Sequence, residues 1–235
     1  MTGIVFDIDD TLYVRQDMIV AAAEDVLGIK VSDPKEFIDI YYAKSDINMD
    51  ALEAGRIKTR DINGWRYEET FRILGLPFKA GDGILTADRY IELQSHMALS
   101  RDMKEVLDAF RADPAIRLAV LTSGKSSHQW KKVEMLGLLN WFERDNIIVT
   151  GDAGISKPDV RLCRIIEEKL DLSPSDIWMI GDSYKHDITG AVESGWHCIW
   201  INRRGIGSPE IKPDIEVATD EELIKVLKEL HKSIS

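Results

Sequence analysis

Five short apolar segments constrain the fold of this chain more than any other feature. They lie at residues 3–6 (GIVF), 117–121 (RLAVL), 146–149 (NIIV), 177–180 (IWMI) and 198–201 (CIWI), with a weaker sixth at 215–218. Apolar runs of this length without strict alternation are typical of strands covered on both faces, as in a parallel sheet. Helix patterns at 101–111, 159–170 and 221–232 alternate with them. Because parallel strands need helical crossovers, we predict an α/β fold with a doubly wound, Rossmann-like parallel sheet.

The interval between the first two predicted strands carries a helical pattern instead. Helices are predicted there at residues 18–27, 34–45, 59–74 and 87–98, separated by glycine-containing breaks. We therefore expect a helical cap domain over residues 14–98, inserted into an α/β catalytic core of residues 1–13 and 99–235. An insertion at this point should lie over the carboxyl edge of the sheet, where doubly wound folds bind ligands. Trp65, Tyr67 and Phe71 are interpreted as helix packing rather than as a stacking surface for a base.

Charge and cysteine content indicate the compartment and the class of partner. The chain has 30 Lys and Arg residues against 41 Asp and Glu, a formal net charge of −11, and this field opposes binding to a nucleic-acid polymer. No window approaches the about 18 apolar residues of a membrane span, and the first residues lack the pattern of a signal peptide. Cys163 and Cys198 are expected to be reduced, buried thiols. These features predict a cytoplasmic protein with no membrane partner, and they leave the oligomeric state open.

Polar residues follow the first two predicted strands. Asp7 and Asp9 come directly after the first strand and point to the same side of an extended chain. Repulsion between two such carboxylates could be offset by a divalent cation, or the segment could be an Asx-rich turn, and the motif alone does not separate the two interpretations. After the second strand, Thr122, Ser123 and Gly124 offer either an anion-binding nest or a plain helix cap, which alone is the commoner use.

Three more residues complete the pattern. Lys157 precedes a proline that starts a helix, Asp182 follows the fourth strand, and Asp187 starts the next helix. Taken singly, the lysine would be a solvated turn and either aspartate a helix cap. Chemistry-bearing residues at four strand ends of one sheet are a far rarer coincidence, so the set as a whole indicates a site.

Four segments of the chain resemble the sequence motifs of the haloacid dehalogenase-like superfamily of hydrolases. They are FDIDDTL (6–12), LAVLTSG (118–124), SKP (156–158) and IGDSYKHDITGA (180–191). The resemblance covers the whole chain, because the helical interval matches the family's cap domain between the first and second motifs. It implies that Asp7 is the nucleophile, that Asp9 is the general acid and base, and that Thr122, Ser123 and Lys157 hold the phosphate.

The same resemblance implies Mg²⁺ as the cofactor. Asp7 and Asp182 would hold it through their carboxylates and Asp9 through its main-chain carbonyl, with Asp187 in support. The acid at position 9 favours phosphoryl transfer over cleavage of a carbon–halogen bond, because a leaving alkoxide needs a proton and a halide does not. The expected activity is that of a magnesium-dependent phosphatase acting on a small phosphorylated metabolite through an aspartyl-phosphate.

The sequence identifies the substrate less precisely than it identifies the reaction. The opening FDIDDTLY resembles the pyrimidine 5′-nucleotidases, which makes a nucleoside 5′-monophosphate the first expectation. Residues 52–57 with Asn63 and Arg66 are similar to the caps of bacterial nucleoside 5′-monophosphatases and of N-acylneuraminate 9-phosphatases. Arg56 and Arg66 are the candidate specificity residues. The alternatives are a sugar phosphatase, a phosphosugar mutase that keeps the phosphoenzyme, a phosphoacceptor receiver domain, and a binding protein without catalysis.

Overall fold

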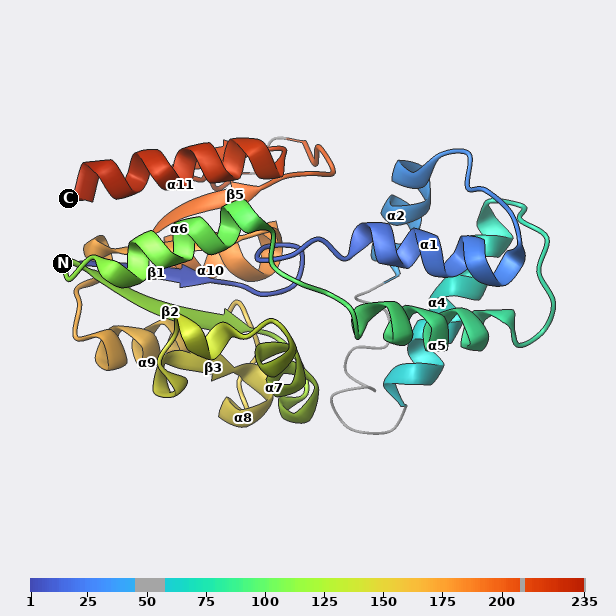
Figure 1. Ribbon diagram of the computed structural model, residues 1–235, viewed down its shortest axis with the longest axis horizontal. Coiled ribbons are helices and arrows are strands. Elements are labelled where there is room, and N and C mark those ends of the chain that lie inside the picture. The colour runs from blue at the N-terminus through green and yellow to red at the C-terminus, as the bar shows by residue number, and fades with distance from the viewer. Residues whose placement is uncertain (45–57, 208–209, 235) are drawn as a thin grey trace. The chain divides into compact units, whose positions relative to one another are not determined.

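The computed structural model describes residues 1–44, 58–207 and 210–234 of the chain (Figure 1). It divides into two compact units. Residues Met1–Val14 and Ala98–Ser235 form one, here called the sheet unit, and Arg15–Met97 form the other, the helical unit. None of the described helices combines the length and the apolar content needed to cross a membrane.

The sheet unit contains six parallel strands within its described residues. They are β1 (Thr2–Phe6), β2 (Ile116–Thr122), β3 (Ile147–Val149), β4 (Ile177–Gly181), β5 (His197–Ile201) and β6 (Ile215–Val217). Their order across the sheet is β3-β2-β1-β4-β5-β6, and every neighbouring pair is parallel. This is the Rossmann order, in which the order of the strands reverses between β1 and β4, and folds of this kind bind ligands at the carboxyl ends of the strands at that point. The predicted doubly wound fold is thereby confirmed.

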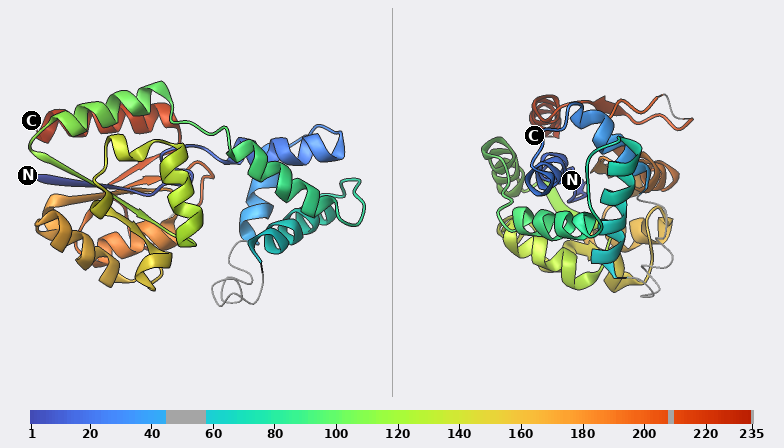
Figure 2. Two further views of the ribbon diagram at one scale, coloured as in Figure 1. Left: turned by 60° about the horizontal axis from the view of Figure 1, so that its bottom comes forward. Right: turned by 90° about the vertical axis from the view of Figure 1, so that its right-hand side faces the viewer.

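Helices cover both faces of this sheet. Those of the sheet unit are α6 (Arg101–Ala112), α7 (Ser126–Met135), α8 (Thr150–Ala153), α9 (Val160–Leu170), α10 (Thr189–Glu193) and α11 (Asp220–Ile234). Helices α6 and α11 lie side by side on one face, and α9 and α10 lie on the other (Figures 1 and 2). A π-helical turn, Tyr184–Ile188, joins β4 to α10.

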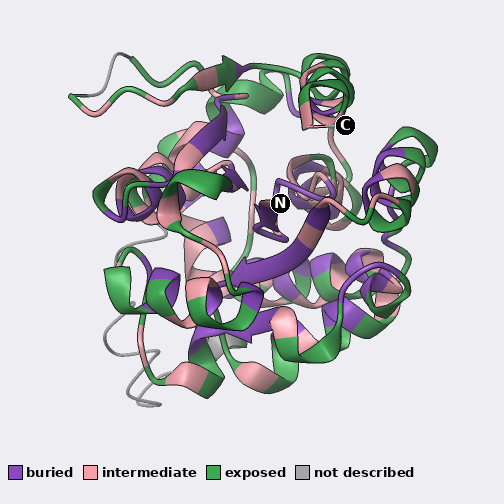
Figure 3. Cartoon of the chain, turned by 90° about the vertical axis from the view of Figure 1, so that its left-hand side faces the viewer, coloured by how far each residue is buried: buried purple, intermediate pink, exposed green. Residues whose placement is uncertain are grey.

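The apolar side chains whose spacing predicts these helices are the ones that the helices bury. On α6, Met103, Val106, Leu107 and Phe110 are all buried, and β1 is buried along most of its length, so that buried residues run through the middle of the unit (Figure 3). Burying apolar side chains of this size is the main source of stability for such a layer. The cysteines are both buried free thiols, as the sequence predicts.

The helical unit comprises α1 (Gln16–Leu27), α2 (Pro34–Ala43), α4 (Thr59–Ile73) and α5 (Asp82–Gln94) among its described residues. Its core is aromatic. The ring centroids of Tyr41 and Tyr67 lie 4.8 Å apart, and those of Phe37 and Phe71 lie 6.2 Å apart. Tyr67 and Phe71 are fully buried, which agrees with their interpretation as packing residues.

Helix α5 differs from its prediction, which placed it at residues 87–98. The structure starts it at Asp82 and ends it at Gln94. The sequence predicts a glycine-containing break before residue 87, yet Gly83 lies inside the helix, where a Cβ atom would come within 2.3 Å of the carbonyl oxygen of Gly64 on α4. The residue is glycine because two helix backbones approach closely there, and not because the chain turns.

Candidate active site

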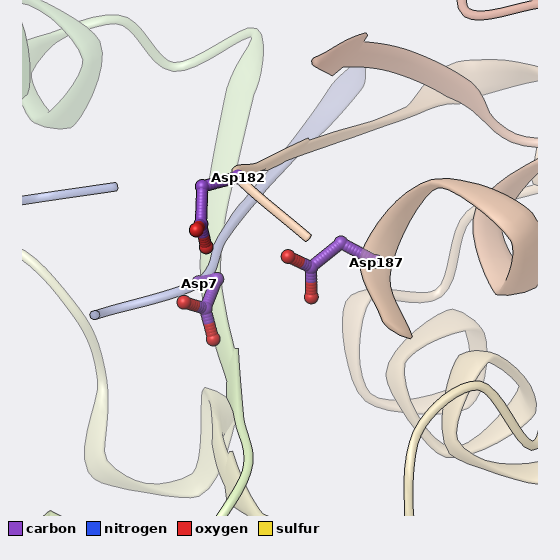
Figure 4. Close-up of side chains that lie close together, drawn as sticks. All are labelled: Asp7, Asp182 and Asp187. Atoms are coloured by element: carbon purple, nitrogen blue, oxygen red, sulfur yellow. The ribbon is translucent and has the colours of Figure 1, made fainter. Parts of the chain in front are cut away.

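The end of β1 and the end of β4 place two aspartates next to each other. Asp7 follows β1 directly, and its N–H donates to the carbonyl oxygen of Ile180 at 2.9 Å, so that the parallel pairing continues into the site. Asp182 follows β4 in the same way. Asp187 lies in the π-helical turn beyond it. One carboxylate oxygen from each of the three aspartates lies within 4.8 Å of the other two, and the three side chains converge in Figure 4.

These three carboxylates suit a hard divalent cation. Mg²⁺ prefers oxygen ligands and is commonly bound by one or two carboxylates together with substrate phosphate. Three carboxylates held this close repel one another unless positive charge lies among them. Asp7 and Asp182 were both predicted ligands, and Asp187, predicted in a supporting role, belongs to the same cluster. The carboxylate of Asp9 is not part of it.

Lys157 brings a positive charge into the cluster. Its Nζ atom donates to Oδ1 of Asp7 at 2.7 Å and to Oδ1 of Asp187 at 2.7 Å, and its side chain is only 3% exposed. Burial raises the pKa of the Asp7 carboxyl to about 7, although Lys157 opposes the rise. Burial alone would lower the pKa of Lys157, but Asp187 and Asp7 together raise it. The lysine therefore stays charged between two carboxylates. Because the cluster has three carboxylates and one ammonium, further positive charge would lower the repulsion within it.

Glycine makes room for this arrangement. A Cβ atom on Gly181 would lie 2.4 Å from Oδ2 of Asp187, and one on Gly190 would lie 2.7 Å from the carbonyl oxygen of Pro158. Oδ2 of Asp187 also accepts a hydrogen bond from the N–H of Ser183 at 3.0 Å. Asp187 thus stabilises its own turn while it contacts Lys157, but the residue that caps this turn is Ser183, whose hydroxyl accepts a hydrogen bond from the N–H of His186.

The end of β2 supplies a buried hydroxyl. Thr122 is 1% exposed, and among the described residues its Oγ1 atom has no hydrogen-bond partner. A buried hydroxyl without a partner is costly, and a ligand oxygen would satisfy it. Ser123 is exposed. The N–H of Gly124 donates to Oγ1 of Thr150 at 3.0 Å, so the nest expected from the sequence has one donor fewer than the residue pattern suggested.

Asp9 has partners that the sequence did not reveal. Nζ of Lys132, on α7, lies 2.7 Å from Oδ1 and 2.5 Å from Oδ2 of Asp9. The hydroxyl of Tyr13 donates to Oδ1 at 2.5 Å, and the amide of Gln129 donates to Oδ2 at 3.4 Å. The one available signal was the spacing of Gln129 and Lys132, which places both on one face of a helix.

The two specificity candidates belong to the helical unit. Arg56 lies outside the described residues. Arg66 is half-buried on α4, and its guanidinium is hydrogen-bonded to the side chain of Tyr41. Burial lowers the pKa of Arg66, an effect that Tyr41 opposes and Arg15 reinforces. Arg66 therefore has a packing role within the unit in addition to any role in recognition.

The sheet order and the aspartate cluster are typical of α/β enzymes, and they place a candidate cation-binding site at the carboxyl ends of β1 and β4. The sequence pattern of the haloacid dehalogenase-like hydrolases matches residues 1–195. The chain belongs to this family, as its four motifs indicated.

Named relatives differ in how much of the chain they match. Pyrimidine 5′-nucleotidase YjjG of Escherichia coli is 25% identical over 227 residues, which is 95% of this chain and 96% of the relative. Human N-acylneuraminate-9-phosphatase is 32% identical over 112 residues, 47% of this chain and 44% of the relative. The alignments with the first curated relatives span less than half of those proteins' length.

A solved structure supports the fold over nearly the whole chain. The HAD-hydrolase YfnB from Bacillus subtilis, crystallised bound to magnesium, superimposes with a TM-score of 0.68 at 24% sequence identity. The match covers 96% of this chain and 98% of YfnB. At this level of identity, the likeness shows a shared fold.

Proposed function

We propose that this hydrolase is a magnesium-dependent phosphatase that cleaves a small phosphorylated metabolite through an aspartyl-phosphate on Asp7. The observation that carries the proposal is the cluster of Asp7, Asp182 and Asp187, with the buried ammonium of Lys157 donating to Asp7 and to Asp187. A carboxylate beside a fixed cation and a candidate metal site is suited to attack a phosphate dianion, because the positive charges lower the repulsion between nucleophile and substrate.

The reaction has two steps. An oxygen of Asp7 attacks phosphorus, the bond from phosphorus to the ester oxygen breaks, and Asp9 gives its proton to the leaving alkoxide. In the second step Asp9 takes a proton from water, the water oxygen attacks phosphorus, and the bond to Asp7 breaks to release phosphate. Lys157 and Thr122 would hold the phosphate oxygens, with Ser123 at the exposed edge.

The residues that would hold Mg²⁺ are Asp7 and Asp182 through their carboxylates and Asp9 through its main-chain carbonyl, with Asp187 in support. When bound, the ion supplies positive charge that stabilises the transferring phosphoryl group. The oxygen-only donor set and the closeness of the three carboxylates support this assignment.

For the substrate, we propose a nucleoside 5′-monophosphate. The similarity to a pyrimidine 5′-nucleotidase over 95% of the chain supports it. A phosphorylated sugar is the second candidate, since the N-acylneuraminate-9-phosphatase is similar over about half of the chain. Arg66, and Arg56 outside the described residues, remain the proposed contacts for the part of the substrate beyond its phosphate.

A panel of phosphorylated metabolites, assayed for released phosphate with and without Mg²⁺, tests the proposal. We expect turnover of at least one nucleotide or sugar phosphate that depends on Mg²⁺ and on Asp7. Acid-quenched enzyme should carry a phosphate on Asp7, detectable by mass spectrometry of the peptide. Release of chloride from 2-chloropropionate with no release of phosphate from any ester would overturn it.

A further inference from the structure

The carboxylate of Asp9 is held on both of its oxygens by neighbouring side chains. Lys132 contacts both oxygen atoms, Tyr13 donates to Oδ1, and Gln129 donates to Oδ2. The pair is well shielded, because the side chain of Lys132 is 7% exposed and that of Asp9 is 14% exposed. An aspartate on the surface would rotate among several rotamers, whereas this one has a fixed direction.

Helix α7 links this carboxylate to the end of β2. The amide of Gln129 also donates to the carbonyl oxygen of Ser123 at 2.7 Å. Gly124 lies against the same side chain, since a Cβ atom there would be 2.8 Å from Nε2 of Gln129. Gln129 and Lys132 stand on one face of α7, so the helix that follows the phosphate-holding residues also holds the side chain of Asp9.

Proton transfer needs this kind of order. A general acid or base must lie within hydrogen-bond reach of the proton that it moves, and a misplacement of about 1 Å can cost about 100-fold in rate. A buried ion pair contributes little net stability, but removing one of its partners strongly destabilises the folded protein. A shielded lysine at this point is therefore better explained by orientation of Asp9 than by stability of the fold.

We propose that Lys132 is a positioning residue which, with Gln129 and Tyr13, orients the carboxylate of Asp9 for proton transfer. The inference rests on the proposed phosphatase function and adds a residue outside the four motifs. Lys132 acts through Asp9, and no contact with the substrate is assigned to it. Its removal should affect the steps that need Asp9 and leave the binding of substrate and metal unchanged.

The test compares K132M and K132R with K131M. Methionine keeps the length of the side chain and removes the charge, arginine keeps a cation, and Lys131 is the exposed neighbour on the same helix. Each variant is assayed with p-nitrophenyl phosphate and with an alkyl ester, uridine 5′-monophosphate or, if it is not turned over, glucose 6-phosphate. The aryl leaving group barely needs a proton, so it reports everything except assistance by Asp9.

For K132M we expect kcat on the alkyl ester to fall about 10- to 100-fold, part of the contribution typical of general acid–base catalysis, with KM unchanged. The loss on p-nitrophenyl phosphate should be several-fold smaller. K132R should recover most of the rate, and K131M should match the wild type. In the D9N background, K132M should cause little further loss, because residues that act as a unit are not additive.

Three results would overturn the inference while leaving the phosphatase function in place. They are equal losses of K132M on both esters, full additivity with D9N, or no loss at all. If K132M alone does not fold, the D9N/K132M double variant, in which neither charge of the pair remains, is compared with D9N. An equal rate on the alkyl ester supports the inference, and a further loss of about 10-fold or more overturns it. A wild-type protein inactive on every ester would instead overturn the proposed function itself.

Discussion

Gly181 and Asp187 approach so closely that a Cβ atom on the glycine would lie 2.4 Å from Oδ2 of the aspartate. The end of β4 therefore accepts no side chain, and the contact fixes one member of the carboxylate cluster against the backbone of the sheet. Contacts of this kind hold the candidate site residues in place, and they can be tested one at a time.

Replacing Gly181 with alanine should displace the carboxylate of Asp187. We expect G181A to lower the affinity for Mg²⁺ by about 10- to 100-fold, the usual cost of disturbing a group that supports a metal site. Calorimetric titration with Mg²⁺ measures it. G207A is the matched control, because a Cβ atom on Gly207 meets nothing within 4 Å. Equal affinities in wild type and G181A would mean that Asp187 plays no part in the metal site.

The D7N variant should lose turnover and keep its fold. Asparagine fills the same space but is no nucleophile, so no phosphate should appear on the protein after acid quenching. The substitution removes a buried carboxyl whose pKa burial raises to about 7, and Lys157 keeps its ion pair with Asp187. The free energy of unfolding should therefore stay within about 2 kcal/mol of the wild type. Urea denaturation checks this. A near-normal rate in D7N would exclude the covalent route.

K157M should be strongly destabilised in the absence of Mg²⁺. Removing one partner from a buried ion pair costs about 3–5 kcal/mol, and here Lys157 contacts both Asp7 and Asp187. Added Mg²⁺ should restore part of the loss, since it supplies positive charge to the same carboxylates. K169M, at an exposed position, should change stability by less than about 0.5 kcal/mol. Equal stabilities of K157M and K169M would contradict the arrangement.

Binding of Mg²⁺ should stabilise the folded protein by itself. At a concentration of 100 times Kd, a ligand that binds only the native state adds about 2.7 kcal/mol. We expect a corresponding rise in Tm for the wild type, little rise for D182N, and a normal rise for D176N, whose residue is exposed. A full rise in D182N would remove Asp182 from the set of ligands.

R66A should change the order of preference among natural substrates without changing the affinity for Mg²⁺. The activity on p-nitrophenyl phosphate should change little, because this ester offers few groups for recognition. R66K separates charge from the hydrogen bond to Tyr41, and R72A, at an exposed position on the same helix, is the control. An unchanged order in R66A would leave Arg66 with a packing role only.

Much of the fold was predictable, because its signals are local. The sequence shows short apolar runs, and Asp7 and Asp182 each stand at the end of one. The order of such runs along the chain limits the possible topologies. The cluster at the ends of β1 and β4 follows from topology, since adjacent parallel strands bring their carboxyl ends together. For this reason Asp7 and Asp182 could be predicted to meet, whereas Lys157 was expected beside them only from the family resemblance.

Contacts between distant segments could not be predicted. Lys132 is separated from Asp9 by 123 positions, and no spacing rule connects a helix face to the turn after another strand. The role of Gly83 could not be predicted from the sequence either. Its role depends on the backbone of Gly64, so from the sequence alone a glycine that permits close packing cannot be distinguished from one that ends a helix.

The insertion of residues 15–97 as a separate compact unit has a consequence for how such a protein changes over evolutionary time. The residues proposed for attack, for the metal and for the phosphate all belong to the other unit. A lineage can therefore replace or remodel one continuous block of sequence, between Val14 and Ala98, without rewriting the reaction. Preference for one metabolite or another, which we propose depends on this unit, becomes open to selection, while the proposed chemistry of ester cleavage is inherited unchanged.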